Sequence, residues 1–187
     1  QRNANDGISL LQIAEGALNE VSGILIRQRE LAIQAANGTL GSSERTTLDN
    51  EVADLTSEID RIAAVTEFNG TAVLNSTAQI TFQIGIDNSA NDRITVSGVN
   101  ATTAQLGTSG VSLTTQSSAQ SALALIDAAI DEVASLRAGF GTVQNRLESA
   151  IRSIAVAVEN TTAAESRIRD VDFASETAEL TRNQVLQ

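Results

Sequence analysis

A heptad-like series of aliphatic residues between positions 123 and 158 constrains the fold of this chain more than any other feature. Its members recur every three or four residues, which places them on one face of an α-helix. Gly139 and Gly141 fall inside the series and weaken the helix locally, by about 1 kcal/mol each relative to Ala. The pattern predicts a helix of about 45 residues, on the order of 65 Å long. The series is Leu123, Ile126, Ile130, Val133, Leu136, Phe140, Val143, Leu147, Ile151, Ile154 and Val158.

Two further helices are expected in the first third of the chain. The first covers Ile8 to Ala36, with Asp6 as its N-cap and an Asn-Gly turn at its end. Ser42 and Ser43 offer N-caps for the second helix, whose apolar residues are spaced 4, 3, 4 and 3 apart. The short link between the two helices makes them antiparallel neighbours. The apolar residues of the second helix are Leu48, Val52, Leu55, Ile59 and Ile62.

The middle of the chain changes from helical to strand periodicity. Asn69-Gly70 ends the helical pattern, and residues 80–86 then alternate between apolar and polar side chains. A second alternating stretch begins at Arg93, so the two predict a β-hairpin. Residues 99–118 are rich in Thr, Ser, Gly and Ala, which leaves open a low-complexity linker or an ordered surface segment.

The composition favours an elongated architecture over a compact one. Only 2% of the residues are aromatic, and the apolar ones are mostly Ala, Val, Ile and Leu. We therefore expect a mainly α protein, an elongated rod-like bundle of long helices with coiled-coil-like seams and a small β-hairpin. One domain is expected, with N-terminal helices in 1–66, the hairpin and the Ser/Thr-rich loop in 67–118, and C-terminal helices in 119–187.

Missing residue types and net charge exclude several functional classes. The chain has no Cys and no His, so disulfides, nitrogen or sulfur metal ligands, and Ser–His or Cys–His catalytic pairs are excluded. The net charge of −11 disfavours binding to nucleic acid. Without an apolar run of about 18 residues, no membrane span is expected. We expect no cofactor and no catalytic residue.

Carboxylates gather near the C-terminus, where a helix break is expected. Asp172 is a candidate N-cap for a last helix, with Glu176 in its first turn and Asp170 just before it. An enzyme that acts through paired carboxylates stays an alternative. It is the less favoured one, because a thin helical bundle rarely forms a concave pocket.

Several long motifs resemble bacterial flagellin. They are "RNANDGIS", "EGALNEV", "RQRELAIQAANGT" and "EIDRIAAVTEFNGTAVL" in the first half, and "AIDEVASLRAGFGTVQNRLESAI" and "ESRIRDVDFASETAELTRNQVLQ" in the second. The resemblance implies a rod of two N-terminal helices, a hairpin and a long C-terminal helix. It also implies a structural subunit of the flagellar filament that packs laterally and axially with other flagellin subunits and serves motility.

The resemblance further implies where and with what the protein works. Flagellins are extracellular and leave the cell through the flagellar export apparatus without a cleaved signal peptide, aided by a secretion chaperone and a filament cap. The start at Gln1 resembles a flagellin core whose terminal polymerisation helices are removed and whose outer domains are absent. Such a fragment is expected to be monomeric. Alternatives are a hook–filament junction protein, which shares the terminal patterns, and a secreted coiled-coil adhesin.

Flagellins are also recognised by a Toll-like innate immune receptor, and this chain carries matching residues. The alternative is that the charged ones are ordinary solvated residues and that the isoleucines belong to the core. Ile26 departs from the family, in which Gln is common at that place. The matching residues are Arg27, Glu30 and Leu31 in "RQRELAIQ", Glu51 in the second helix, and Ile126 and Ile130 in the third.

Other charged residues on the helices are candidates for pairing between neighbouring subunits. These are Arg29, Arg61, Asp127 and Arg137. The alternative is solvation, because an exposed ion pair contributes only about 0–1 kcal/mol.

Overall fold

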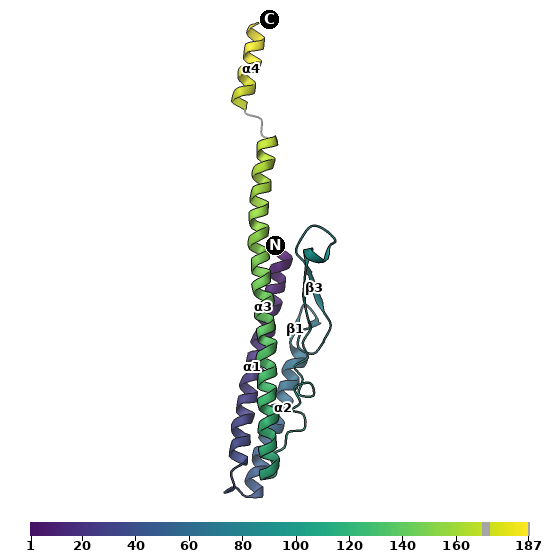
Figure 1. Ribbon diagram of the computed structural model, residues 1–187, viewed down its shortest axis with the longest axis vertical. Helices are drawn as coiled ribbons and strands as arrows, with labels where there is room; N and C mark the ends of the chain where they lie inside the picture. Colours follow the sequence, from purple (N-terminus) through teal and green to yellow (C-terminus); the bar gives the residue numbers. More distant parts are fainter. Residues whose placement is uncertain (170–172, 187) are drawn as a thin grey trace.

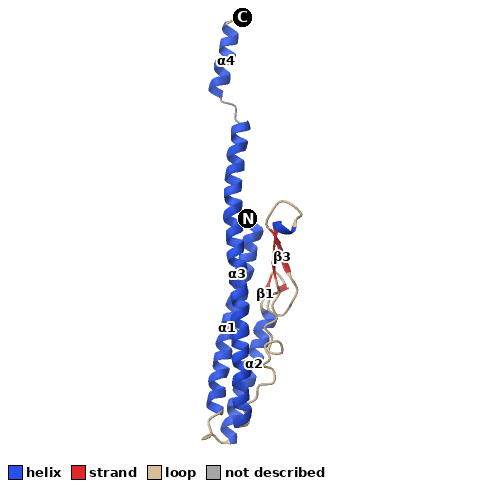
Figure 2. Ribbon diagram, viewed as in Figure 1, coloured by secondary structure: helices blue, strands red, loops and turns tan. Residues whose placement is uncertain are grey.

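The protein is a long helical rod with a small β region along one side (Figure 1). The computed structural model describes residues 1–169 and 173–186. Figure 2 separates the helices from the short strands and loops between them. The helices are α1 (Arg2–Ala35), α2 (Ser42–Val65), α3 (Gln116–Arg169) and α4 (Phe173–Val185), with a short 3-10 helix η1 (Ala90–Asp92). The strands are β1 (Glu67–Phe68), β2 (Thr71–Ala72), β3 (Ile80–Gln83) and β4 (Arg93–Val96).

Helix α1 is the common neighbour of α2 and α3, which confirms the expected bundle. It runs antiparallel to α3, because Arg29 of α1 bonds Asp127 while Glu15, earlier in α1, faces Arg137, later in α3. Helix α3 has 54 residues and is therefore about 80 Å long. It extends well past the start of α1, and α4 lies beyond its C-terminal end (Figure 1).

The predicted apolar face of α3 is confirmed, but only part of its length is buried. Ile126, Val133, Phe140 and Leu147 are buried at intervals of seven residues. Farther along, Val158 belongs to the same predicted face yet is 55% exposed. Leu147 already lies against Gly7, near the start of α1, so Val158, three helical turns later in the antiparallel α3, lies beyond that start. The burial of this face thus depends on how far α1 reaches along it.

The expected hairpin is present, and a second, smaller one was not predicted. Strands β3 and β4 are antiparallel, with Ile80 opposite Val96. The alternation expected up to residue 86 ends at Gln83, where β3 stops. Strands β1 and β2, each of two residues, form a hairpin whose turn is Asn69-Gly70. The φ angles of these two turn residues are 50° and 75°. Two successive positive φ angles suit the tight turn that joins such strands, and Asn and Gly adopt them readily.

Two of the predicted helix starts are wrong. Helix α1 begins at Arg2, four residues before the proposed cap Asp6, because Ala4 is already fully buried in the core and extends the helical face. Helix α2 is preceded by Gly41 as its N-cap, so Ser42 and Ser43 lie inside the first turn. The carbonyl oxygen of Gly41 accepts a hydrogen bond from the backbone N–H of Arg45 and is the first acceptor of the helix. The proposed cap Asp172 lies outside the described residues.

The Thr/Ser-rich stretch is an ordered segment, so the linker interpretation is wrong. The carboxylate of Asp60 on α2 accepts the backbone N–H and the hydroxyl of Thr103, both at 2.8 Å. Asp49, three helical turns earlier on α2, accepts the N–H of Leu113 at 2.5 Å. Leu113 is fully buried and Leu106 nearly so. Two acidic residues of α2 therefore hold a loop whose own periodicity is weak.

A buried glutamine divides the core along α1. The buried residues of α1 up to Leu25 belong to one apolar cluster, and those from Leu31 onward belong to another. Gln28 lies between them and is fully buried. Its Nε2 donates to Thr56 Oγ1 of α2 at 2.9 Å, whereas its Oε1 has no partner among the described residues. A buried carbonyl oxygen without a partner is costly.

Replacing Gln28 with Met is expected to stabilise the protein by about 1 kcal/mol, because the unpaired oxygen disappears while the volume is nearly kept. Thr56 still donates its hydroxyl to the carbonyl of Val52, so it is not left without a bond. Chemical denaturation measures the effect. Gln34→Met, at an exposed position of the same helix, is the control. A loss of stability in Gln28→Met would show that the Gln28–Thr56 bond outweighs the unpaired oxygen.

Candidate functional site

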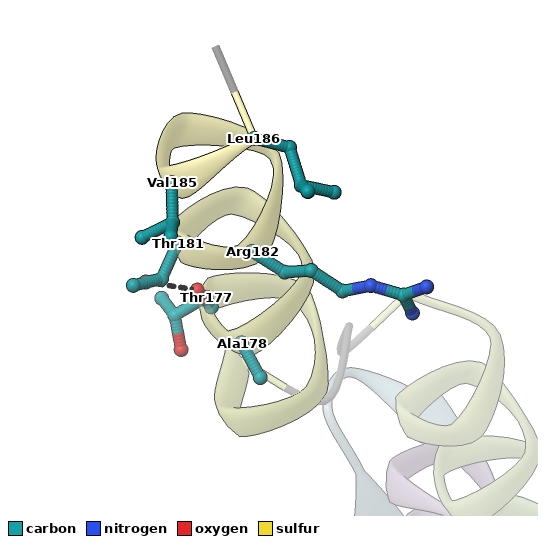
Figure 3. A pocket seen from close by; sticks show the side chains of 6 residues that line it. All are labelled: Thr177, Ala178, Thr181, Arg182, Val185 and Leu186. Atoms are coloured by element: carbon teal, nitrogen blue, oxygen red, sulfur yellow. Dashed lines mark hydrogen bonds between the residues drawn. The ribbon is translucent and has the colours of Figure 1, made fainter.

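The alternative of an enzyme that acts through paired carboxylates can be compared with the arrangement of the acidic side chains. Within 1–169 and 173–186, no group of three or more acidic side chains is placed to hold a metal ion. The hollow in Figure 3 lies along one side of α4 and is lined by residues of that helix and by Leu186, which follows it. Of the carboxylates near the C-terminus, Asp170 and Asp172 lie outside the described residues, and Glu176 is exposed in the first turn of α4.

No helix in the described parts of the chain combines the length and the apolar character needed to cross a bilayer.

Three of the six candidate receptor residues form one charged cluster on the surface of α1 and α2. Arg27 donates from Nε and Nη2 to Glu51 Oε1, at 3.0 and 2.8 Å, and from Nη1 to Glu30 Oε2 at 3.1 Å. The hydrogen bond to Glu51, followed by that to Glu30, raises the pKa of the Arg27 guanidinium. All three side chains are between 43% and 60% exposed. The cluster ties the two helices together and stays open to a partner.

The apolar candidates lie behind this surface. Leu31 and Ile126 are buried, at 1% and 0% exposure, in the same apolar cluster between α1 and α3. Ile130 is half-buried and packs against both clusters of the core. In this conformation Arg27, Glu30 and Glu51 are exposed, whereas Leu31 and Ile126 are buried and present no surface for a partner to touch.

The charges considered for pairing between subunits are paired within the chain. Arg29 Nε donates to Asp127 Oδ1 at 2.6 Å, which links α1 to α3 and raises the pKa of Arg29. Arg61 bonds Glu58 on its own helix through Nε at 2.7 Å and Nη2 at 2.6 Å.

The fourth of these charges, Arg137, faces Glu15 across α1 and α3, with Nη2 3.6 Å from Oε1. Each of the four charged side chains therefore has an oppositely charged partner within the same copy of the chain.

Sequence reasoning missed the polar residues that join the elements. Gln28 occupies a core position of α1, and its signal was a polar side chain seven residues after Val21 in an apolar series. Asp49 and Asp60 are charged residues of α2 whose carboxylates accept hydrogen bonds from the Thr/Ser-rich stretch 99–118. No local pattern pointed to those two roles, because the bonded partners lie 43 and 64 residues away.

Comparison with known proteins explains the rod. Residues 1–79 match the profile of the bacterial flagellin N-terminal helical region, and residues 123–187 match that of the C-terminal helical region. A flagellin of Halalkalibacterium halodurans is 40% identical over 186 residues, which cover 99% of this chain and 68% of that protein. A flagellar filament 30.7 kDa core protein of Treponema maltophilum is 40% identical over 200 residues, covering 100% of this chain and 70% of that protein.

The fold agrees with these sequence relationships. The crystal structure of Bacillus cereus flagellin superposes with a TM-score of 0.74 at 34% identity, covering 88% of this chain and 94% of that one. The regions matched by the two profiles are also the ones that pack together, since α1 lies along α3. The chain belongs to the bacterial flagellin family.

Proposed function

We propose that this flagellin, a structural subunit of the bacterial flagellar filament, assembles by non-covalent packing of its rods side by side and end to end. The observation that carries the proposal is the 40% identity to a flagellin over nearly the whole chain, together with the same rod fold. Residues 1–187 act in it as one core domain, because α1 packs against both α2 and α3.

Assembly of the complete flagellin polypeptide that contains residues 1–187 tests this proposal. Electron microscopy after addition of salt is expected to show long filaments, whose mass grows above a critical concentration. The 187-residue chain serves as the comparison and is expected to stay monomeric in sedimentation. Absence of filaments from the complete polypeptide would favour a hook–filament junction protein or an adhesin instead.

The proposed surroundings of the protein follow from family membership. The filament lies outside the cell, so the protein reaches it through the flagellar export apparatus, with a secretion chaperone before export and the filament cap at the growing end. Pull-down of the complete polypeptide with the chaperone and the cap protein of the same bacterium is the direct check. The rod itself acts as a building element rather than as an enzyme.

A second proposal is recognition by a Toll-like innate receptor through the cluster of Arg27, Glu30 and Glu51. The support is an exposed guanidinium already held by two carboxylates, which lowers the entropy cost of engaging it. Arg side chains are common among the residues that dominate binding energy. Leu31, Ile126 and Ile130 enter this proposal as the apolar support of the same helices.

Replacing Arg27 with Ala is expected to weaken receptor activation about tenfold, the loss typical of one dominant contact. The helix content in circular dichroism is expected to stay unchanged, because the guanidinium lies at the surface. Arg61→Ala is the matched control, since Arg61 is similarly exposed and pairs within α2. Equal activation by the wild type and Arg27→Ala would rule out this role for Arg27.

A further inference from the structure

The loop between β3 and β4 carries one fully exposed isoleucine. Ile86 is 100% exposed, although two neighbouring apolar residues of the hairpin, Phe82 and Ile84, pack against the core. The loop lies clear of α3 in Figure 1. An apolar side chain left wholly in water contributes nothing to the folding of its own chain, but it gains free energy when another surface covers it.

Hydrogen bonds hold the backbone on both sides of Ile86. The side-chain Nε2 of Gln83 donates to the carbonyl oxygens of Gly85 and Asp87, at 3.1 and 2.8 Å. Arg93 Nε in turn donates to Gln83 Oε1 at 3.1 Å and so fixes the orientation of the amide. Ile86 is therefore presented in a defined conformation, and little conformational entropy is lost when it docks.

A groove of matching character lies between β4 and α3 of the same chain. It has a volume of about 390 Å³. The apolar part of its lining includes Val96, Leu136, Phe140 and Val143. Gly139 leaves the groove open on the α3 side, since a Cβ atom built there would meet nothing within 4 Å. The groove has room for one branched aliphatic side chain and the loop that carries it.

The charges beside the two surfaces are opposite. Asp87 follows Ile86 directly, and Arg146 lines the groove. No ion pair joins either charge to another residue within the described ranges. The pair would attract and would orient an incoming loop.

We propose that Ile86 of one copy inserts into the groove at Gly139 of a second copy, with Asp87 meeting Arg146. The inserting loop and the receiving groove are different surfaces, so each copy keeps one of the two free after the contact forms. Such a head-to-tail contact can repeat from copy to copy, and it builds an open filament when the rotation between copies does not close a ring. The inference rests on the proposed filament function and assigns one of its contacts between subunits.

Variants of the complete flagellin polypeptide test the contact by their critical concentration for assembly. Ile86→Ser removes the inserted side chain, and Gly139→Leu fills the groove. Each is expected to raise the critical concentration about tenfold, the effect of losing one well-buried apolar contact. Gly139→Leu is expected to keep the fold, because a Cβ atom at this position meets nothing within 4 Å and Leu favours a helix more than Gly does. Gly23→Leu, at another helical glycine with open space, is the control.

A charge exchange tests the orientation of the two copies. Asp87→Arg and Arg146→Asp are each expected to raise the critical concentration about threefold, because each places like charges together. The double variant restores the attraction and is expected to return close to the wild-type value. Wild-type assembly by Ile86→Ser and Gly139→Leu, or a double variant no better than the single ones, would overturn the inference while leaving the filament function intact.

Cross-linking separates the contact from filament formation. The chain has no cysteine, so Ile86→Cys and Gly139→Cys can be made as separate variants and mixed before mild oxidation. The mixture is expected to form a disulfide dimer containing one of each variant. A mixture of Gly110→Cys and Gly139→Cys measures the background level of disulfide dimers that form without a specific contact. If the wild type forms no filaments, the proposed function fails, and this pair still decides the inference: dimers above background support it, and dimers at background overturn it.

Discussion

Replacing Leu18 with Ala is expected to lower the free energy of unfolding by about 3–5 kcal/mol. Leu18 is fully buried in the middle of the apolar cluster that α1 shares with α3. The substitution removes buried methyl groups and leaves a cavity that two straight helices cannot easily close. Chemical denaturation followed by circular dichroism measures the change.

Ile26→Ala provides the control for Leu18→Ala. Ile26 lies eight residues later on α1 and is 49% exposed, so its removal creates no enclosed cavity. Its cost is expected to be below about 1 kcal/mol. Similar losses in the two variants would mean that the face of α1 assigned to the core is wrong.

Replacing Gly98 with Ala is expected to cost about 2–4 kcal/mol, because a Cβ atom there would overlap the backbone. It would lie 2.3 Å from the carbonyl oxygens of both Ser76 and Ala78. These backbone atoms cannot rotate away as a side chain does. The segment that contains Ser76 is also hydrogen-bonded to the residue after Gly98, because the backbone N–H of Ser76 donates to the carbonyl oxygen of Val99 at 3.3 Å. The strain therefore falls on the contact between β4 and the segment after β2.

Hydrogen exchange locates the effect of Gly98→Ala and distinguishes it from a general loss of stability. Amides of the β3–β4 hairpin are expected to lose protection first, while those of α1 and α3 keep theirs. Gly110→Ala is the matched control, because a Cβ there meets nothing within 4 Å. Gly110→Ala is expected to leave the free energy of unfolding unchanged or to raise it slightly, because Ala lowers the conformational entropy of the unfolded chain. Equal behaviour of the two alanine variants would contradict the close approach at Gly98.

The periodicity of the chain determined its helical class and the faces of the helices. Residues spaced by three and four lie on one side of a helix whatever surrounds it, so Val133, Phe140 and Leu147 could be assigned to a core before any partner was known. The same reasoning found β3 and β4, where the side chains alternate. Family resemblance, carried by long motifs, gave the rod and its place in a filament, and the comparisons confirm both.

Only the tertiary structure decided how much of each face is buried and what the polar residues do. Val158 has the spacing of a core residue and is exposed, because burial depends on whether another helix reaches it. Leu31 and Ile126, candidates for a surface contact, are buried in the core. Helical periodicity indicates the direction in which a side chain points, but it does not say which element lies opposite.

The polar residues that join distant segments show most clearly that periodicity does not identify a residue's partner. Asp60 bonds Thr103 and Gln28 bonds Thr56, and nothing within a few residues of either one indicates the partner. Local sequence determines a helix because the bonds that form it join residues four positions apart. A bond across 43 residues forms only when the whole chain has folded, and so the sequence determined the elements while the tertiary structure decided their connections.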